Sequence, residues 1–156
     1  MKYIEGNLID LAFEGKFDVI IHGCNCFNTM RSGVAGEIAR RIPNAYFADK
    51  YTQKGDRNKL GTWSGCYSLQ GDFWVINAYT QYNYGYNEDV VYFDYEAFYK
   101  FLTTFRKSLD TEKVIAFPKI GAGLAKGDWN EISFMIDYNL SGYCKEIYIV
   151  TLPENK

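Results

Sequence analysis

The chain has 156 residues and a formal net charge of -2, and 47% of its residues are hydrophobic and 18% aromatic. A chain of this length can bury a core as one domain, which we expect to span residues 1–156. The apolar content excludes a disordered chain, and the near-neutral charge argues against a nucleic-acid or membrane partner held by surface charge.

The first residues, MKYIEGNLID, do not have the continuous apolar stretch of a secretory signal. No apolar run approaches the ~20 residues that a membrane-spanning helix needs. We therefore expect a cytoplasmic protein, in its own cell or in a host cell. In that reducing compartment the four cysteines, Cys24, Cys26, Cys66 and Cys144, are expected to be free thiols.

Strands and helices are predicted to alternate from the start of the chain. KYIEG (residues 2–6) is typical of a short strand, and the apolar run DVIIHG (18–23) of a buried central strand. GVAGEIARRI (33–42) has its apolar residues at helical spacing. Pro43 ends that helix and can begin the next one, PNAYFADKYTQ (43–53).

The middle of the chain is predicted to form a hairpin, an aromatic loop and a long helix. GTWSGCYSL (61–69) and FWVINAYT (73–80) are strand-like and are separated by the turn QGD (70–72). The loop QYNYGYNED (81–89) is rich in tyrosine, asparagine and glycine. Its Tyr82, Tyr84 and Tyr86 either stack on or close over a ligand, or are surface residues. DYEAFYKFLTTFRKSL (94–109) has the apolar stripe of an amphipathic helix.

The C-terminal third repeats the strand and helix pattern. KVIAFP (113–118) is a second buried strand, and the glycine-rich KIGAGLAKGD (119–128) follows it. DWNEISFMIDYNL (128–140) is a helix that Asp128 can cap, and EIYIVTL (146–152) is the last strand. This alternation predicts a layered α/β domain with a largely parallel sheet.

Two glycine-rich loops follow the buried strands, where ligands bind in open α/β sheets. Gly33 and Gly36 lie in the first loop, and Gly121, Gly123 and Gly127 in the second. Such loops either make tight turns or bring backbone N–H groups close to a diphosphate. We favour the ligand-binding interpretation because two such loops share the same sheet edge. Neither loop matches a P-loop or a G-x-G-x-x-G dinucleotide motif.

His22, Cys24 and Cys26 alternate after the first buried strand and would share one face of a continued strand. They offer only three zinc ligands without C-x2-C spacing, and nothing in the sequence brings Cys66 or Cys144 to them. The alternation alone also gives no geometry for a Cys-His nucleophile pair. We therefore interpret the cysteines as packing residues. His22 is either a hydrogen-bonded core residue or a proton-transfer group.

Four segments together resemble a macrodomain, the α/β module that binds ADP-ribose. These segments are IEGNLIDL (4–11), VIIHGCNCFNTMRSGVAGEIARRIP (19–43), VINAYTQ (75–81) and IAFPKIGAGLAKGDW (115–129). The resemblance covers nearly the whole chain and implies a three-layer α/β/α fold with a central mixed, mostly parallel sheet. Within the family, IIHGCNC and GAGL are most similar to the yeast-type ADP-ribose 1″-phosphate phosphatases.

The resemblance also implies the ligand contacts. Asn7 and Leu8 would read the adenine, with Asn7 standing where the family usually has an acid, and Asn25 would hold the distal ribose hydroxyls. The two glycine loops would bind the diphosphate and its riboses. They would do so through Arg31, Ser32, Gly33, Val34, Ile120, Gly121, Ala122, Gly123 and Leu124. The implied ligands are ADP-ribose and ADP-ribose 1″-phosphate, free or attached to a macromolecule, with no cofactor and no metal.

For catalysis, the resemblance places His22 at the position of the histidine proposed for the phosphatase branch, as nucleophile or as general base for a water. Asp128 would orient His22 or the water, or would only cap its helix. Arg31 and Lys126 would pair with the terminal phosphate, or would be solvated.

Three functions follow from the resemblance. The leading one is hydrolysis of ADP-ribose 1″-phosphate to ADP-ribose and phosphate. The second is a non-catalytic reader of ADP-ribose, and the third removes ADP-ribose from modified protein or nucleic acid. In the branch that cleaves ADP-ribose esters, an Asp directly follows G-x-G-L, and this chain has Ala125 there. This missing acid disfavours the third function. The lysine that follows the aromatic strand in that branch is also replaced, within NAYTQ (77–81), which disfavours a covalent lysine-ribose mechanism.

Overall fold

The computed structural model describes residues 1–153. Its strands are β1 (Lys2–Glu5), β2 (Val19–Cys24), β3 (Trp63–Ser68), β4 (Phe73–Tyr79), β5 (Val114–Phe117) and β6 (Glu146–Thr151). Its helices are α1 (Leu8–Phe13), α2 (Gly33–Arg41), α3 (Pro43–Lys50), α4 (Tyr95–Phe105) and α5 (Trp129–Leu140), with short 3-10 turns at Arg57–Lys59 and Arg106–Ser108.

The strands form one six-stranded sheet in the order β1-β6-β5-β2-β4-β3. All neighbouring strands are parallel except β3 and β4, which are antiparallel. The predicted turn at 70–72 joins these two strands as a hairpin, and Asp72 adopts a positive φ of 59° there. The expected mixed, mostly parallel sheet is therefore confirmed.

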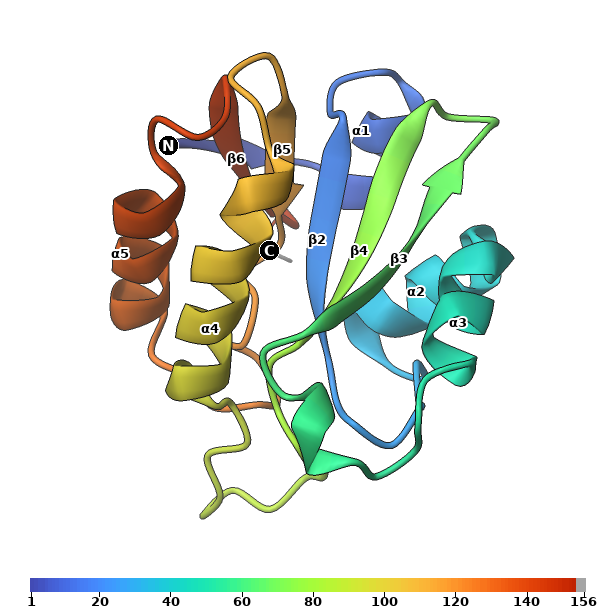
Figure 1. Cartoon of the computed structure of the whole chain (residues 1–156), viewed down its shortest axis with the longest axis vertical. Coiled ribbons are helices and arrows are strands. Elements are labelled where there is room, and N and C mark those ends of the chain that lie inside the picture. The colour runs from blue at the N-terminus through green and yellow to red at the C-terminus, as the bar shows by residue number, and fades with distance from the viewer. Residues whose placement is uncertain (154–156) are drawn as a thin grey trace.

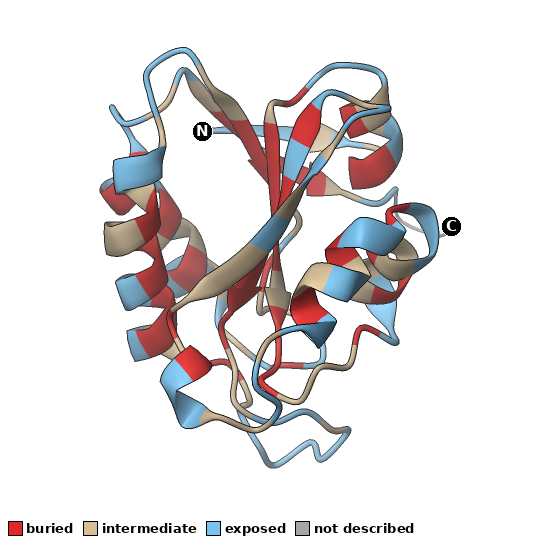
Figure 2. Ribbon diagram, turned by 45° about the vertical axis from the view of Figure 1, so that its right-hand side comes forward, coloured by how far each residue is buried: buried red, intermediate tan, exposed pale blue. Residues whose placement is uncertain are grey.

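Helices cover both faces of this sheet, which gives three layers. Figure 1 shows α4 and α5 on one side and α1, α2 and α3 on the other. Each side has its own apolar cluster: one contains Phe98, Phe101 and Ile132, and the other Ile9 and Ile38. In Figure 2 the buried residues follow the strands and the helix faces turned toward them. The α/β/α fold that the resemblance implied is confirmed.

Three of the helices begin at residues that are typical of helix starts, namely a proline in the first turn or an aspartate at the N-cap. Pro43 is the first residue of α3, and Asp94 and Asp128 cap α4 and α5 by accepting from Ala97 N and Asn130 N. The sequence did not predict α1, because its six residues are too few for a helical period. Asn7 begins it by accepting from the N–H groups of Ile9 and Asp10.

The parallel topology decides where a ligand can bind. The carboxyl ends of β2, β4 and β5 meet at one edge, and the loops after them are residues 25–32, 80–94 and 118–128. Among residues 1–153, no helix is both long and apolar enough to cross a membrane.

Candidate functional site: a cation-lined cavity at the sheet edge

A cavity of about 450 Å³ opens at the carboxyl ends of β2, β4 and β5. The two predicted glycine loops form two of its walls, and the loop after β4 forms a third. Ten of the predicted site residues line it: His22, Asn25, Arg31, Ser32, Gly33, Val34, Ile120, Gly121, Gly123 and Leu124. The structure thus brings these ten residues together around one cavity, and their contacts with a ligand stay a prediction.

The charge of the cavity has one sign. Arg31 and Lys119 line it, and none of its described lining residues is an aspartate or a glutamate. Lys126 is exposed and does not line the cavity, which agrees with the solvated alternative that the sequence analysis left open for it. Such a lining favours an anionic ligand.

The first wall is the start of α2. Its first helical hydrogen bond runs from Gly36 N to the Ser32 carbonyl at 3.1 Å, and the Ser32 side chain makes no capping bond. The N–H groups of residues 33–35 therefore have no acceptor within the helix. Val34 and Ala35 line the cavity, so this helix end can receive an anion.

A glycine is required where the first loop turns into α2. A Cβ on Gly36 would lie 2.7 Å from the Arg31 carbonyl oxygen, which is closer than real Cβ atoms approach. Asn25 shapes the same loop by accepting from Phe27 N at 2.8 Å and donating to Thr29 Oγ1 at 2.7 Å. Its predicted contact with ribose hydroxyls stays a prediction.

A buried lysine holds the first loop from below. Lys59 is only 6% exposed. Its Nζ donates to Asn28 Oδ1 at 2.6 Å and to the Cys26 carbonyl at 3.2 Å, and it lies 4.7 Å from the centre of the Tyr79 ring. The sequence gave no sign of this role, because Lys59 lies 31 residues from Asn28.

The second wall is the glycine loop after β5, which folds back on itself. Gly127 N donates to the Gly121 carbonyl at 2.7 Å. Gly121 has a φ of 75°, and a Cβ there would lie 2.3 Å from the Phe93 ring. Glycine is thus required at Gly121, while Gly123 faces open space in the cavity, with no atom within 4 Å of a Cβ built there.

His22 is fixed by a buried hydrogen bond to the neighbouring strand. It is 1% exposed, and its Nε2 lies 2.6 Å from Asn77 Oδ1 on β4. Asn77 Nδ2 donates to the Ala45 carbonyl at 3.0 Å and to Ser64 Oγ at 3.1 Å, which leaves Oδ1 as the acceptor. His22 therefore carries its proton on Nε2, and Nδ1 has the free lone pair.

The bond to Asn77 is the first link in a longer chain of donors. Ser64 Oγ lies 2.8 Å from the Tyr79 hydroxyl, and that hydroxyl donates to Asp49 Oδ1 at 2.7 Å. An ionised carboxylate can only accept, so the Tyr79 hydroxyl donates to Asp49 and the Ser64 hydroxyl donates to the Tyr79 oxygen. Burial raises the pKa of Asp49, and the Tyr79 hydrogen bond opposes that rise. Through this chain of hydrogen bonds, the Asp49 carboxylate on α3 helps to fix the position of His22.

Burial lowers the pKa of His22 to about 4, and the hydrogen bond to Asn77 only partly opposes the shift. The ring is therefore neutral at pH 7. The unfolded chain binds a proton near the ordinary pKa of 6.5, so stability falls as the pH drops from 6.5 to about 4. The cost approaches about 3 kcal/mol at the lower end.

We expect the free energy of unfolding of the wild type to fall between pH 7 and pH 4.5 by more than that of His22→Gln, which keeps a donor for Asn77. Urea titrations at both pH values give the difference. Comparing the two proteins cancels the opposite contribution of Asp49, whose raised pKa favours the folded state at low pH. Equal pH dependence in both proteins would contradict the neutral buried His22.

The cysteines around His22 are packing residues. Cys24 Sγ lies 3.8 Å from Nε2 and 3.9 Å from Nδ1 of that ring. Burial raises the pKa of Cys24 well above its ordinary range and that of Cys26 to about 11, so both thiols are protonated at neutral pH. Within residues 1–153, no three His, Cys, Asp or Glu side chains gather closely enough to hold a metal.

Four predicted site residues do not line the cavity: Asn7, Leu8, Ala122 and Asp128. Asp128 Oδ1 accepts from Asn130 N at 2.9 Å as the cap of α5, which is the alternative that the sequence analysis left open. The structure pairs His22 with Asn77 rather than with Asp128. The roles predicted for these four residues in binding or catalysis stay predictions.

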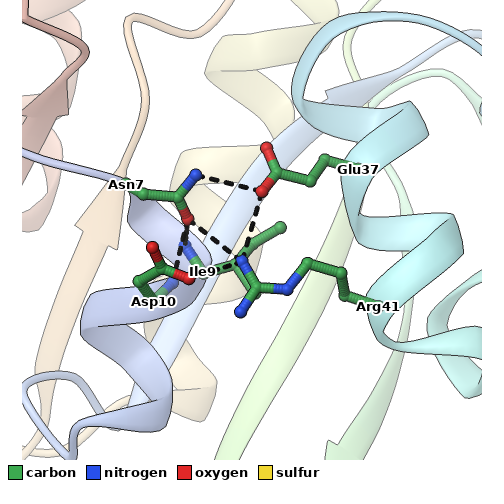
Figure 3. A network of polar contacts seen from close by, with 5 residues as sticks. All are labelled: Asn7, Ile9, Asp10, Glu37 and Arg41. Carbon is green, nitrogen blue, oxygen red and sulfur yellow. Dashed lines mark hydrogen bonds and ion pairs between the residues drawn. The ribbon is translucent and has the colours of Figure 1, made fainter.

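Asn7 is engaged between two helices. Its side-chain oxygen caps α1, and its Nδ2 donates to Glu37 Oε1 of α2 at 3.0 Å. Figure 3 shows Arg41 joining the same group, with its Nη1 2.6 Å from Asp10 Oδ1. Leu8 is buried in the apolar cluster beneath α1. The predicted adenine contact would require Asn7 to exchange these bonds for the base.

Comparison with known proteins gives one sequence relative and many structural ones. No family model matches the chain. Over 143 residues it is 39% identical to the "Uncharacterized 17.5 kDa protein in tk-vs intergenic region" of Enterobacteria phage T4, and the match covers 88% of each chain.

Solved structures of macrodomains share the fold. The macrodomain of Thermus aquaticus DarG superimposes with a TM-score of 0.71 at 17% identity, covering 98% of this chain and 97% of that one. Thermosipho africanus DarTG, solved in complex with ADP-ribose, gives a TM-score of 0.69 at 15% identity over 100% of this chain and 43% of its own. The chain therefore belongs to the family of the phage T4 17.5 kDa protein, and its fold is that of a macrodomain.

Proposed function

We propose that the cavity binds ADP-ribose and that the protein hydrolyses ADP-ribose 1″-phosphate to ADP-ribose and phosphate. The binding proposal rests on the residues that line the cavity. They include two cations and no carboxylate among those described, and the start of α2, which has no side-chain cap, borders the same cavity. A diphosphate is an anion that suits such a site. The complex of Thermosipho africanus DarTG with ADP-ribose, on the same fold, supports this choice of ligand.

In this proposal the diphosphate lies between the two glycine loops. The N–H groups at the start of α2 face it from one side, and the loop from Gly121 to Leu124 from the other. Arg31 and Lys119 supply charge to the phosphates. Lys59 holds the first loop and the Gly127–Gly121 bond closes the second in the ligand-free chain, so we expect binding to order little backbone.

We assign one step of this reaction to His22. Its Nδ1 takes a proton from a water whose oxygen bonds to the 1″-phosphorus, and the bond between phosphorus and the ribose oxygen breaks. The electron pair stays on the ribose oxygen, which takes the proton back from Nδ1. A base with a pKa of about 4 is weaker than an ordinary histidine, so we assign it about 100-fold, the lower end of the range for general-base catalysis.

One observation favours a second function, a reader that binds ADP-ribose without cleaving it. His22 is 1% exposed and weakly basic. The other titratable side chains among the described residues that line the cavity are two cations, two tyrosines and one cysteine. A reader needs only the binding walls, all of which are present.

Phosphate release from ADP-ribose 1″-phosphate distinguishes the two functions. We expect turnover by the wild type and about 100-fold less by His22→Ala, with ADP-ribose affinity retained in the variant. Asp128→Asn is the matched control, since asparagine keeps the cap of α5 while removing the carboxylate. We expect this control to match the wild type.

Each result has a separate meaning. Wild-type turnover that His22→Ala retains would exclude His22 as the base. A large loss in Asp128→Asn would restore the catalytic role that the family resemblance implied for Asp128. ADP-ribose binding without any phosphate release would replace the phosphatase with the reader.

A further inference from the structure

The sheet has two edge strands, and only one of them is protected against pairing with another chain. β1, at one end of the strand order, has four residues and carries Lys2 and Glu5. β3, at the other end, has six residues, WSGCYS, with no charge and no proline (Figure 1). Natural sheets discourage edge-to-edge pairing by keeping edge strands short and by placing charged side chains or proline on them. β3 has none of these features, so its free edge can accept a further strand.

Every second residue of β3 directs its backbone groups away from the sheet. Tyr79 N donates to the Thr62 carbonyl at 3.0 Å just before β3 begins, and the register with β4 continues from there without a bulge. Hydrogen-bonded and non-bonded pairs alternate along an antiparallel ladder, so Trp63, Gly65 and Tyr67 lie in the non-bonded pairs. Their N–H and C=O groups therefore face the free edge. Within residues 1–153, no other element forms a hydrogen bond with these groups.

Aromatic side chains border this edge on the face that α4 covers. Trp63 is partly buried there and packs on Phe101 and Phe105 of α4. Tyr67 lies on the same face of β3, because residues four apart in a strand point the same way. Tyr67 is 36% exposed and its cross-strand neighbour Trp74 is 47% exposed, with ring centroids 5.4 Å apart. Exposed rings beside free backbone groups suit a partner strand that carries aromatic residues of its own.

A second copy of β3 provides such a strand. Antiparallel pairing about a two-fold axis at Gly65 sets Gly65 opposite the partner's Gly65, and Trp63 opposite the partner's Tyr67. The residues that meet in this register are the ones whose backbone groups are free, so each pair can exchange two hydrogen bonds. Trp63 and Tyr67 then form aromatic pairs across the two chains on both sides of the axis, and such pairs stabilise adjacent strands.

The charges near the two ends of β3 also favour antiparallel pairing of two copies. Before β3, Arg57 is exposed, and the exposed Lys100 of α4 places its Nζ 3.4 Å from the Leu60 carbonyl. After β3, the hairpin turn carries the exposed Asp72. None of these three charged side chains forms an ion pair within residues 1–153. Antiparallel pairing brings the basic end of each strand toward the acidic end of its partner, so unlike charges approach each other.

We propose that the free edge of β3 is a homodimer interface, at which two copies of the chain pair antiparallel and join their sheets into one continuous sheet. No residue of β3 lines the cavity at the carboxyl ends of β2, β4 and β5. The dimer therefore leaves the cavity open in both copies. The inference is independent of the proposed function, because it depends only on the edge of the sheet.

Sedimentation equilibrium of the wild type and three variants, from about 1 μM to about 500 μM, tests the interface. Tyr67→Pro removes an N–H that faces the free edge and takes no donor from the ladder with β4, and Tyr67→Lys places a charge on the edge. The matched control Tyr3→Lys places the same charge on β1, the other edge strand, where Tyr3 is 52% exposed. We expect the wild type to dimerise and both Tyr67 variants to raise the dissociation constant of the dimer at least about tenfold. We expect Tyr3→Lys to match the wild type.

Thermal unfolding of each variant shows that it is folded. If Tyr67→Pro does not fold, Tyr67→Lys carries the test, because exposed edge strands accept lysine. A wild type that stays monomeric at about 500 μM would overturn the inference. A dimer that neither folded Tyr67 variant weakens would place the interface away from β3. A dimer that Tyr3→Lys alone weakens would place it at β1, and either result would also overturn the inference.

Discussion

Replacing Gly123 by leucine is expected to abolish ADP-ribose binding without weakening the fold. No atom lies within 4 Å of a Cβ at this position, and its backbone φ lies outside the left-handed region, so a side chain enters open cavity instead of the protein core. The leucine would occupy the volume that the diphosphate needs between the two glycine loops. We expect affinity to fall at least about 100-fold, which corresponds to about 3 kcal/mol.

Ala122→Leu is the matched control for Gly123→Leu. Ala122 is the preceding residue in the same loop, is partly exposed, and does not line the cavity. Calorimetry with ADP-ribose and thermal unfolding of both variants give the comparison. We expect both variants to melt within a few degrees of the wild type and only Gly123→Leu to lose binding. Undiminished affinity in Gly123→Leu would mean that the ligand does not pass between these loops.

Replacing Asn77 by leucine is expected to cause the largest loss of stability among these changes. Asn77 is fully buried, and its amide bonds His22, the Ala45 carbonyl and Ser64. Leucine would leave the His22 N–H buried without an acceptor, at about 1–3 kcal/mol, and would remove the amide hydrogen bonds to the Ala45 carbonyl and to Ser64 Oγ, at about 1 kcal/mol each. We expect the free energy of unfolding in urea to fall by about 3 to 4 kcal/mol.

A double variant separates the lost hydrogen bond from the changed side-chain shape. In His22→Phe/Asn77→Leu the buried N–H is removed together with its acceptor, so part of the loss should be recovered. We expect the double variant to be more stable than the sum of the two single changes predicts, by about 1 kcal/mol or more. Strict additivity would mean that the bond between His22 and Asn77 contributes nothing specific.

The fold could be predicted because its signals are local. The apolar runs at 18–23 and 113–118 became the buried strands β2 and β5, and the periodic segment 94–109 became α4. Only α1 was missed among the α-helices, since its six residues make fewer than two turns and give no usable period. Its start signal was present in Asn7, which the family resemblance had assigned to adenine instead.

The site was predictable only in part. Glycines after buried strands are a local signal, and they correctly marked two walls of the cavity. The chain of donors that positions His22 was not predictable, because it joins Asn77, Tyr79 and Asp49 through folding. Nothing in the periodicity of α3 marks Asp49 as a buried acceptor. The loop 81–89 could be singled out by its composition, but whether Tyr84 and Tyr86 line the cavity or only face solvent depends on loop packing.

The central claim is that the cation-lined cavity binds ADP-ribose, and direct calorimetric titration of the wild type with ADP-ribose tests it. We predict saturable binding with one ligand per chain, weakened by rising salt because Arg31 and Lys119 face the diphosphate. The absence of any binding signal at millimolar ADP-ribose would contradict the account.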